Sequence, residues 1–504
     1  MSSISKNEST NEYLEALNKA TNTIDTYSGP VPDALDAILS SLDLKIDPAS
    51  FLLELREKFF DLGIGKIIEA LIRHDKRTGI KKAYLVIGEN IYSLPTVKGT
   101  QDEEAIIISK LRQKTGYITL DPGFVNTGAC KSDITFVDGE KGLLRYRGYD
   151  ISELSQKSTF IETAMLLIFG NLPTPKERAD FRRMLTDNEM LHEDLRHHFD
   201  GFPPHGEPMA LLSAILNTMS AYEPELQLED EEHFSLLVAK IMSKIRTIAA
   251  NTYNKSSGHP LVYPDPSMRY CENFLSMMFS IPNKKHKPTM IEIEALEKVL
   301  ILHADHEQNC STSTVRIVGS SETNLFGSIS AGVNALRGKA HGGANAAVIQ
   351  MLDQMKKSGI SIKDYIEKFK SGKIRLMGFG HRVYKNFDPR AKILKEAAEQ
   401  VVTNLKVHDP LLDIAKQLEE IALEDDYFKQ RKLYPNVDFY SGIVLKALKI
   451  PVNMFPVIFA IGRTPGWIAH WREQNFDKDK KIARPRQIYT GIKYRPYITM
   501  EERR

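Results

Sequence analysis

Residues 233–251, HFSLLVAKIMSKIRTIAAN, show the pattern that decides the fold. Their apolar side chains recur three and four residues apart, as on one face of an α-helix, and do not alternate as in a strand. Similar helical segments cover 161–170 and 209–222, and strand signals are absent from about Ile151 onward. The sequence therefore predicts an all-α, mainly helical body.

The first part of the chain has a different character. The sequence of residues 1–80 predicts a helical extension of unknown role. The first 28 or so of these residues are polar, and we expect them to be disordered. A turn at Gly88-Glu-Asn90 between two short apolar runs predicts a β-hairpin, and a small β-rich segment is expected over 81–140. The helical body would then occupy 141–504.

Composition limits the class of protein. The 504 residues suffice for several domains, and 42% hydrophobic with 26% charged residues are typical of a soluble globular protein. A net charge of +2 disfavours a dedicated nucleic-acid binder. The three cysteines (Cys130, Cys271 and Cys310) lie far apart, without metal-ligand spacing, and their odd number favours a reducing compartment.

The sequence shows no recognisable targeting or membrane-spanning segment. No apolar run approaches the roughly 18 residues that cross a membrane. The N-terminus lacks the apolar core of a signal peptide and the arginines of a mitochondrial transit peptide. The last residues do not form a peroxisomal Ser-Lys-Leu ending. We therefore expect a cytoplasmic protein that does not bind membranes.

The stretch Leu376–Arg390, LMGFGHRVYKNFDPR, combines groups that suit a small anionic carbonyl compound. Gly378 and Gly380 allow positive φ or a close approach of a ligand to the backbone. His381 can donate a hydrogen bond, and Arg390 can bind a carboxylate through two parallel bonds. A surface loop with a solvated basic face is the alternative.

Two histidines, His303 and His306, stand in the sequence HADHEQN at the end of a predicted helix. Their spacing of three predicts that both lie on one side of this helix. The order is neither His-Glu-x-x-His nor its inverse, so a metal site is disfavoured. Core or capping histidines and a ligand-facing pair both remain open.

His341, in the sequence KAHGGAN, precedes a predicted helix. The positive end of the helix dipole would lower its pKa and keep the ring neutral, so that it could donate a hydrogen bond to an enolate oxygen. An N-capping turn is the alternative.

Asp438 is flanked by Val437 and Phe439, and its partial desolvation would raise its basicity. Its alternative role is a plain helix N-cap. Arg463 and Arg484 each stand on a predicted stiff, proline-containing loop, and each could equally be a salt-bridge partner or solvated.

Six motifs in order, HADHEQN, AHGGAN, MGFGHRVYKNFDPR, PNVDFYSG, GRTPGW and ARPRQ, resemble those of citrate synthase, and specifically its bacterial-type branch. The resemblance covers about Ile91 to Arg495. It implies a nearly all-helical fold with a large domain and an inserted small domain, roughly 345–450, that closes over the substrate.

The resemblance also implies a reaction, the condensation of acetyl-CoA with oxaloacetate and water to citrate and CoA. By position in the motifs, His341 would donate to the thioester oxygen, Asp438 would take the methyl proton and His381 would polarise the ketone. The oxaloacetate carboxylates would be held by His306, Arg390, Arg463 and Arg484, and CoA would contact Met377, Gly378, Phe379 and Gly380. In the family the arginine matching Arg484 comes from the neighbouring subunit, so a homodimer or a hexamer is expected. No metal and no further cofactor are implied.

This sequence departs from the family pattern beside His341, with Lys339 in place of the usual proline and Ala346 in place of glutamate. 2-Methylcitrate synthase, which uses propionyl-CoA, shares the same catalytic groups and stays an alternative. A catalytically silent scaffold is the non-enzyme alternative, but none of the three catalytic groups is lost.

Overall fold

The computed structural model describes residues 81–88, 90–223, 230–405 and 410–503, with scattered positions before residue 80. The chain forms two compact units, one of Met1–Cys130 with Arg486–Arg504 and one of Lys131–Pro485. The extension predicted over 1–80 lies almost wholly outside the described residues. It stays a prediction, as do the predicted domain boundaries.

The first unit contains an antiparallel sheet in the order β1-β2-β3. Strand β1 (Lys82–Ile87) pairs with β2 (Asn90–Lys98), with Ile87 opposite Asn90, and β2 pairs with β3 (Glu104–Ile106). Gly88 in the connecting turn has φ +59°, as tight hairpins require. The predicted hairpin is therefore confirmed. A short helix, α5 (Leu111–Thr115), follows the sheet, and a 3-10 turn, η3 (Met500–Glu502), lies near the C-terminus.

The second unit begins with a small antiparallel sheet of β4 (Thr135–Asp138), β5 (Leu143–Tyr146) and β6 (Tyr149–Asp150). From there to Phe476 the described residues contain helices and no named strand, which confirms the mainly helical fold. The helices are α6 (Ile151–Lys157), α7 (Phe160–Phe169), α8 (Pro175–Asp187), α9 (Leu195–Asp200), α10 (Pro208–Thr218), η1 (Met219–Ala221), α11 (Glu231–Ser256), α12 (Tyr270–Phe279), α13 (Met290–His303), α14 (Cys310–Gly319), α15 (Leu325–Arg337), α16 (Ala344–Ser358), α17 (Ile362–Lys370), α18 (Pro389–Asn404), α19 (Pro410–Glu424), α20 (Asp426–Arg431), α21 (Val437–Ala447), η2 (Val452–Met454) and α22 (Phe455–Phe476).

Local sequence signals explain where several helices begin. Helices α7, α8 and α13 each start with a threonine and carry a glutamate three residues later. In each, the threonine side chain accepts the glutamate N–H and the glutamate returns the bond to the threonine N–H. Such capping boxes satisfy N–H groups that a helix end otherwise leaves unpaired.

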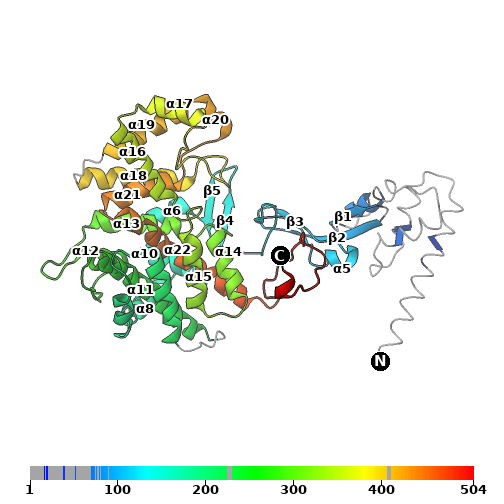
Figure 1. The fold of residues 1–504 in the computed structure, drawn as a ribbon, viewed down its shortest axis with the longest axis horizontal. Helices are drawn as coiled ribbons and strands as arrows, with labels where there is room; N and C mark the ends of the chain where they lie inside the picture. Colours follow the sequence, from blue (N-terminus) through cyan, green and yellow to red (C-terminus); the bar gives the residue numbers. More distant parts are fainter. Residues whose placement is uncertain are drawn as a thin grey trace. The chain divides into compact units, whose positions relative to one another are not determined.

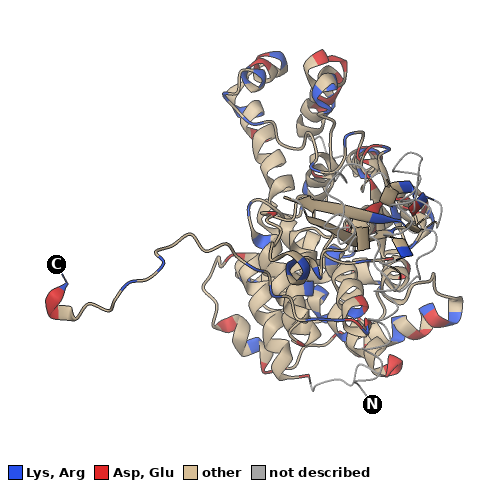
Figure 2. Cartoon of the chain, turned by 90° about the vertical axis from the view of Figure 1, so that its right-hand side faces the viewer, with Lys and Arg blue, Asp and Glu red and all other residues tan. Residues whose placement is uncertain are grey.

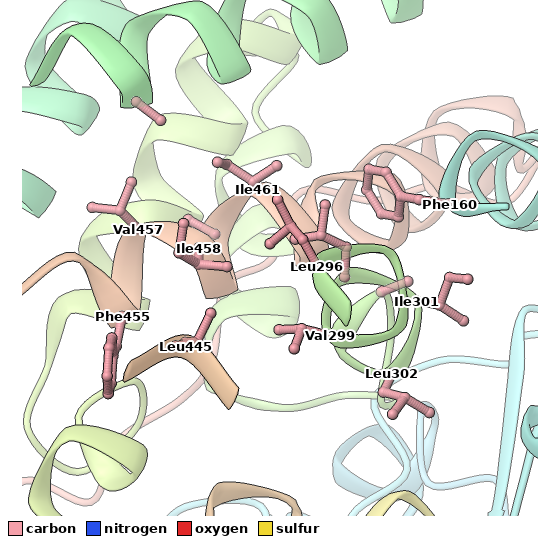
Figure 3. Close-up of a cluster of buried hydrophobic side chains, with 14 of the residues drawn as sticks. Phe160, Leu296, Val299, Ile301, Leu302, Leu445, Phe455, Val457, Ile458 and Ile461 are labelled. Carbon is pink, nitrogen blue, oxygen red and sulfur yellow. The ribbon is translucent and has the colours of Figure 1, made fainter. Parts of the chain in front are cut away.

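Helix α22 forms the centre of the core. Figure 3 shows its residues Val457, Ile458 and Ile461 beside Leu296 and Val299 of α13, with Phe160 of α7 and Leu445 of α21 around them. All of these side chains are buried. The helices that carry the motif residues are therefore packed against one shared apolar cluster.

The GRTPGW motif lies inside α22, so the prediction that Arg463 stands on a loop is wrong. Proline inside a helix removes one hydrogen bond and normally kinks or ends it. Next to Pro465, the N–H of Gly466 donates to the carbonyl of Ala304 at 3.2 Å, a tertiary contact outside the helix. A Cβ at Gly466 would lie 2.3 Å from that carbonyl, so glycine is what allows the close approach.

Figure 1 shows α16, α17, α18, α19, α20 and α21 together at one end of the second unit, with α13 and α22 between them and α8, α10, α11 and α12. Helix α18 packs on both α21 and α13. Lysine, arginine, aspartate and glutamate are interspersed over the helices (Figure 2). Among the described helices, none has the length and apolar character needed to span a membrane.

Candidate active site

His381 lies in the loop between α17 and α18 in one defined protonation state. Its Nδ1 accepts hydrogen bonds from the backbone N–H groups of Val383 (3.0 Å) and Tyr384 (3.2 Å). Burial and the nearby charge of Arg390 lower its pKa to about 4, so the ring is neutral at neutral pH. Because backbone N–H groups can only donate, Nδ1 carries no hydrogen and Nε2 carries one. His381 is therefore a neutral donor through Nε2.

His306 follows the end of α13, so the prediction that His303 and His306 share one helix side is wrong. The helix ends at His303, a core histidine whose Nδ1 donates to the Val299 carbonyl at 2.7 Å. His306 instead turns toward His381, with ring centroids 5.4 Å apart, and its Nε2 lies 3.1 Å from the hydroxyl of Tyr384. Burial and Arg390 hold its pKa well below its usual value.

Arg390, in the first turn of α18, is buried and held by Asp388. Its Nε and Nη2 donate to the two carboxylate oxygens of Asp388, each at 2.9 Å. Burial alone would raise the pKa of Asp388, but the charge and hydrogen bonds of Arg390 keep it below its usual value. The pair is thus fully ionised, and Asp388 sets the orientation of the guanidinium.

Arg463 is only 2% exposed and incompletely paired. Its Nε donates to the carbonyl of His303 at 2.6 Å, whereas the buried Nη1 has no hydrogen-bond partner among the described residues. An unpaired buried donor on a cation carries a large desolvation cost. An anion placed against Nη1 would remove that cost.

His341 lies at the positive end of a helix, but the contact is with α14 as well as with the following α16. The backbone N–H of Ser311, in the first turn of α14, donates to its Nε2 at 3.3 Å, and the Ser311 hydroxyl lies 2.9 Å from the same nitrogen. Trp467 Nε1 donates to this hydroxyl at 3.2 Å. Nε2 is therefore unprotonated and Nδ1 carries the hydrogen.

Burial, followed by the charge of Arg463, lowers the pKa of His341 to about 4. The neutral ring predicted from the sequence is thus present. Gly342 beside it serves packing, since a Cβ there would lie 2.3 Å from the Leu336 carbonyl. Gly342 therefore allows the turn after α15 to be tight.

Asp438 is half-buried in the first turn of α21, between buried Val437 and Phe439. The helix N-cap is Asn436, whose side chain accepts the Asp438 N–H at 3.0 Å, so the alternative of a plain N-cap at Asp438 does not apply. Burial raises the pKa of Asp438 to about 6, with Asp388 adding to the rise and Arg390 and Arg463 opposing it. Its carboxylate is ionised at neutral pH and more basic than an exposed aspartate.

The loop Met377–Gly380 is paired with the segment that leads into α21. Gly380 N–H donates to the Tyr434 carbonyl at 2.8 Å, and Asn436 N–H donates to the Gly378 carbonyl at 2.9 Å. Gly378 and Gly380 have φ of +81° and +76°, so glycine meets a conformational requirement at both positions. This pairing fixes the backbone before His381 relative to the backbone before Asp438.

The charges of Arg463 and Arg390 act on the pKa values of the other site residues. Both shift the pKa of His306 and of Asp438, and Arg463 also shifts that of His341. Arg484 is different: it is exposed, and no hydrogen bond or ion pair of the described residues joins it to this group. The neighbouring Ala483 N–H donates to Ser320 Oγ at 3.0 Å.

Sequence reasoning missed the residues that orient the others, namely Asp388, Tyr384 and Ser311. Asp388 had a readable signal, because an aspartate before Pro389 is a typical N-cap followed by proline at the first helical position. Ser311 and the Tyr384 hydroxyl had none, since their partners His341 and His306 are distant in sequence. Within the described part of the chain, no group of three or more His, Cys, Asp or Glu side chains could hold a metal ion.

Comparison with known proteins identifies the group to which these residues belong. Residues 123–486 match the family model of the citrate synthase C-terminal domain. The chain belongs to the citrate synthase family. Citrate synthase 1 of Mycobacterium tuberculosis is 51% identical over 413 residues, which are 81% of this chain and 96% of the relative. Citrate synthase of Corynebacterium glutamicum is 46% identical over 430 residues, 84% of this chain and 98% of the relative.

Solved citrate synthase structures share the fold. The Thermoplasma acidophilum enzyme, in a ternary complex with carboxymethyl coenzyme A and oxaloacetate, is 31% identical with a TM-score of 0.70 and covers 76% of this chain and 100% of its own. The Pyrobaculum aerophilum enzyme is 34% identical with a TM-score of 0.70, and the match covers 81% of this chain and 97% of its own. The prediction of a citrate synthase-type acyltransferase is therefore confirmed.

Proposed function

We propose that this enzyme condenses acetyl-CoA with oxaloacetate and water to give citrate and CoA. The observation that carries the proposal is the pair of neutral histidines, one donating through Nε2 and the other through Nδ1, together with a carboxylate of raised pKa. The names of the curated relatives and the ligands of the Thermoplasma acidophilum complex support the same substrates.

Oxaloacetate is a dianion that needs cationic partners. Arg463 has a buried, unpaired Nη1, and Arg390 is oriented by Asp388, so both are prepared for carboxylates. His306 and, from a neighbouring subunit, Arg484 complete the proposed set. His381 donates its Nε2–H to the ketone oxygen, which makes the carbonyl carbon more electrophilic.

The difficult step is removal of a proton from the methyl group of the thioester, a very weak acid. Asp438 takes this proton while His341 donates its Nδ1–H to the thioester oxygen, so that the developing enolate is stabilised as it forms. The enolate carbon then attacks the polarised ketone carbon, and water cleaves the resulting thioester to release CoA. A neutral histidine can donate this hydrogen bond through its one N–H.

The proposal also covers the CoA site, the cofactor requirement, the oligomeric state and the location of the enzyme. We place CoA against the backbone of Met377–Gly380 and require no metal or further cofactor. The active form is a homodimer or a larger homo-oligomer, because Arg484 is supplied in trans, and the enzyme acts in the cytoplasm.

Release of free CoA, measured with acetyl-CoA and with propionyl-CoA in the presence of oxaloacetate, tests the reaction. We expect turnover with acetyl-CoA and a higher kcat/KM for it than for propionyl-CoA. A strong preference for propionyl-CoA would favour 2-methylcitrate synthesis, and no turnover with either would refute the enzymatic assignment.

The role of Asp438 has a separate test. In Asp438→Ala we expect turnover to fall by at least about 10³-fold while oxaloacetate binding, measured by calorimetry, stays within about threefold of wild type. Loss of both properties would contradict the assignment of Asp438 as the base.

A further inference from the structure

An open surface cavity of about 300 Å³ lies in the helical unit, and the proposed reaction does not use the residues that line it. Among them, His205, Ser257, Lys449 and Asn453 are exposed. Three segments form it: the turn before α10 with His205, the end of α11 with Tyr253, Ser256 and Ser257, and the segment between α21 and α22 with Lys449 and Asn453. A volume of this size is at the lower end of those that hold small-molecule ligands.

The side chains that line the cavity are suited to an anion. Lys449 carries an ammonium group and His205 an imidazole, and the hydroxyls of Tyr253 and Ser257 and the amide of Asn453 can donate hydrogen bonds. The Ser256 hydroxyl instead donates to the Tyr253 carbonyl at 2.9 Å. None of the described residues that line it carries a carboxylate. Neither Lys449 Nζ nor the His205 ring has a hydrogen-bond or ion-pair partner within the described residues, so both remain available for a ligand.

Most carbonyls at the end of α11 are already hydrogen-bonded. The carbonyls of Tyr253, Asn254 and Lys255 accept the N–H groups of Ser257, His259 and Gly258 at 2.9, 2.8 and 3.1 Å. Three of the four carbonyls in the last turn therefore have a donor, which weakens their repulsion of an anion.

Both basic residues stand where glycine would be the easier choice. His205 has φ +64° and Lys449 has φ +62°. Lys449 follows the end of α21, with its N–H bonded to the Lys446 carbonyl at 2.9 Å, a position that helices most often fill with glycine. Two side chains with uncommon backbone conformations therefore face one cavity, and each supplies a cationic or cationisable group.

We propose that this cavity binds a compact multivalent anion, either a phosphate-bearing or a polycarboxylate metabolite. Lys449 supplies a positive charge and His205 an imidazole, and Ser257, Tyr253 and Asn453 supply neutral donors. The bound anion contacts the connector between α21, which carries Asp438, and α22, which carries Arg463. The proposal stands independently of the reaction assigned above.

Calorimetric titration of the full-length enzyme with pyrophosphate, and separately with malonate, tests the site. Lys449→Gly and His205→Gly remove the ammonium group and the imidazole and also relieve the positive φ, so neither variant should lower the thermal midpoint. Lys298→Ala removes a lysine that lines another, smaller cavity of about 200 Å³ and is the matched control.

We expect wild type and Lys298→Ala to bind at least one probe with Kd below about 1 mM, and Lys449→Gly to weaken that binding at least about tenfold. If only pyrophosphate binding depends on Lys449, the natural ligand carries phosphate. If only malonate binding depends on Lys449, the natural ligand carries carboxylates. No binding of either probe, or binding that is unchanged in both glycine variants, would overturn the proposal.

Discussion

Asp388 shows how one buried carboxylate organises the chemistry of its neighbours. It binds Arg390 through two bonds of 2.9 Å, and its Oδ2 also accepts the N–H of Val437 at 3.0 Å. It thereby ties the start of α18 to the start of α21. Its negative charge also adds to the raised pKa of Asp438. The proposed base, Asp438, and Arg390, which is proposed to bind oxaloacetate, are thus both positioned by a residue with no proposed contact to substrate.

Asp388→Asn should lower the free energy of unfolding by about 3–5 kcal/mol, because it leaves the buried guanidinium of Arg390 without its counter-charge. Chemical unfolding measures this loss. Asp353→Asn is the control: this aspartate pairs with Lys357 at 3.1 Å on the surface, and its removal should cost no more than about 1 kcal/mol. Equal losses in the two variants would argue against a structural role for Asp388.

The raised pKa of Asp438 indicates that the group proposed for catalysis lowers the stability of the folded protein. Its pKa in the folded enzyme is about 6, against an ordinary value of 3.8. Because the folded state binds the proton more tightly, the associated stability is full below about pH 3.8 and is lost as the pH rises through about 6. The ionised carboxylate therefore destabilises the working enzyme.

Asp438→Asn should remove this cost. At pH 8 we expect its free energy of unfolding to exceed that of wild type by about 1–3 kcal/mol, with turnover abolished. The difference should shrink toward zero as the pH falls to about 4. Thermal midpoints of both proteins across this range provide the measurement, and a pH-independent difference would show that burial of the charge is not the cause.

At the scale of elements, the loop before His381 and the segment before α21 behave as one structure. Phe379 forms an isolated β-bridge with Pro435, and the Asn436 side chain donates to the Gly380 carbonyl at 2.8 Å. Helix α22 is comparable, because next to its interior proline the Gly466 N–H donates to the Ala304 carbonyl outside the helix. In both cases tertiary contacts, rather than local preference, hold the backbone that carries a site residue.

Gly378→Ala tests the paired loop. The new Cβ would lie 2.8 Å from Val348 Cγ2 and 2.9 Å from Phe439 Cδ2 at a φ of +81°, so we expect a loss of at least about 2 kcal/mol in stability and a lower kcat. Gly372→Ala isolates backbone strain, since Gly372 has φ +73° with nothing within 4 Å of the built Cβ. It should cost about 1 kcal/mol and leave kcat unchanged. If the two variants were equivalent in kcat, the packing of the loop would not matter for catalysis.

At the scale of the whole molecule, the proposed site is incomplete within one chain. Arg484 is exposed and unconnected to the other groups of the described chain, whereas Arg390 and Arg463 are buried among them. A second copy of the chain that supplies Arg484 would complete the set of ligands for a dianion. Catalysis would then depend on assembly.

Mixing two inactive variants tests this dependence. We expect Arg484→Gln and Asp438→Asn to be nearly inactive alone. After co-refolding as a mixed dimer they should recover roughly a quarter of wild-type turnover, since half of the dimers are mixed and each holds one intact site. No recovery would place Arg484 in the site of its own chain, and full activity of Arg484→Gln alone would remove it from the site.

The sequence by itself determined the helical class, the hairpin near Gly88 and the motif positions, because helical periodicity, turn residues and capping signals are local properties of the chain. It also indicated a neutral His341 and a basic Asp438 through their immediate neighbours. Only the tertiary structure decided which nitrogen of each histidine carries the hydrogen, that Arg463 lies in a helix, and that Asp388 orients Arg390. For His341 the partner is Ser311 and for α22 it is Ala304, both of which are far away in sequence and meet these elements only in the folded core. The partners of His381 and Arg390 lie within three residues, but their contacts depend on a backbone conformation that the tertiary structure imposes.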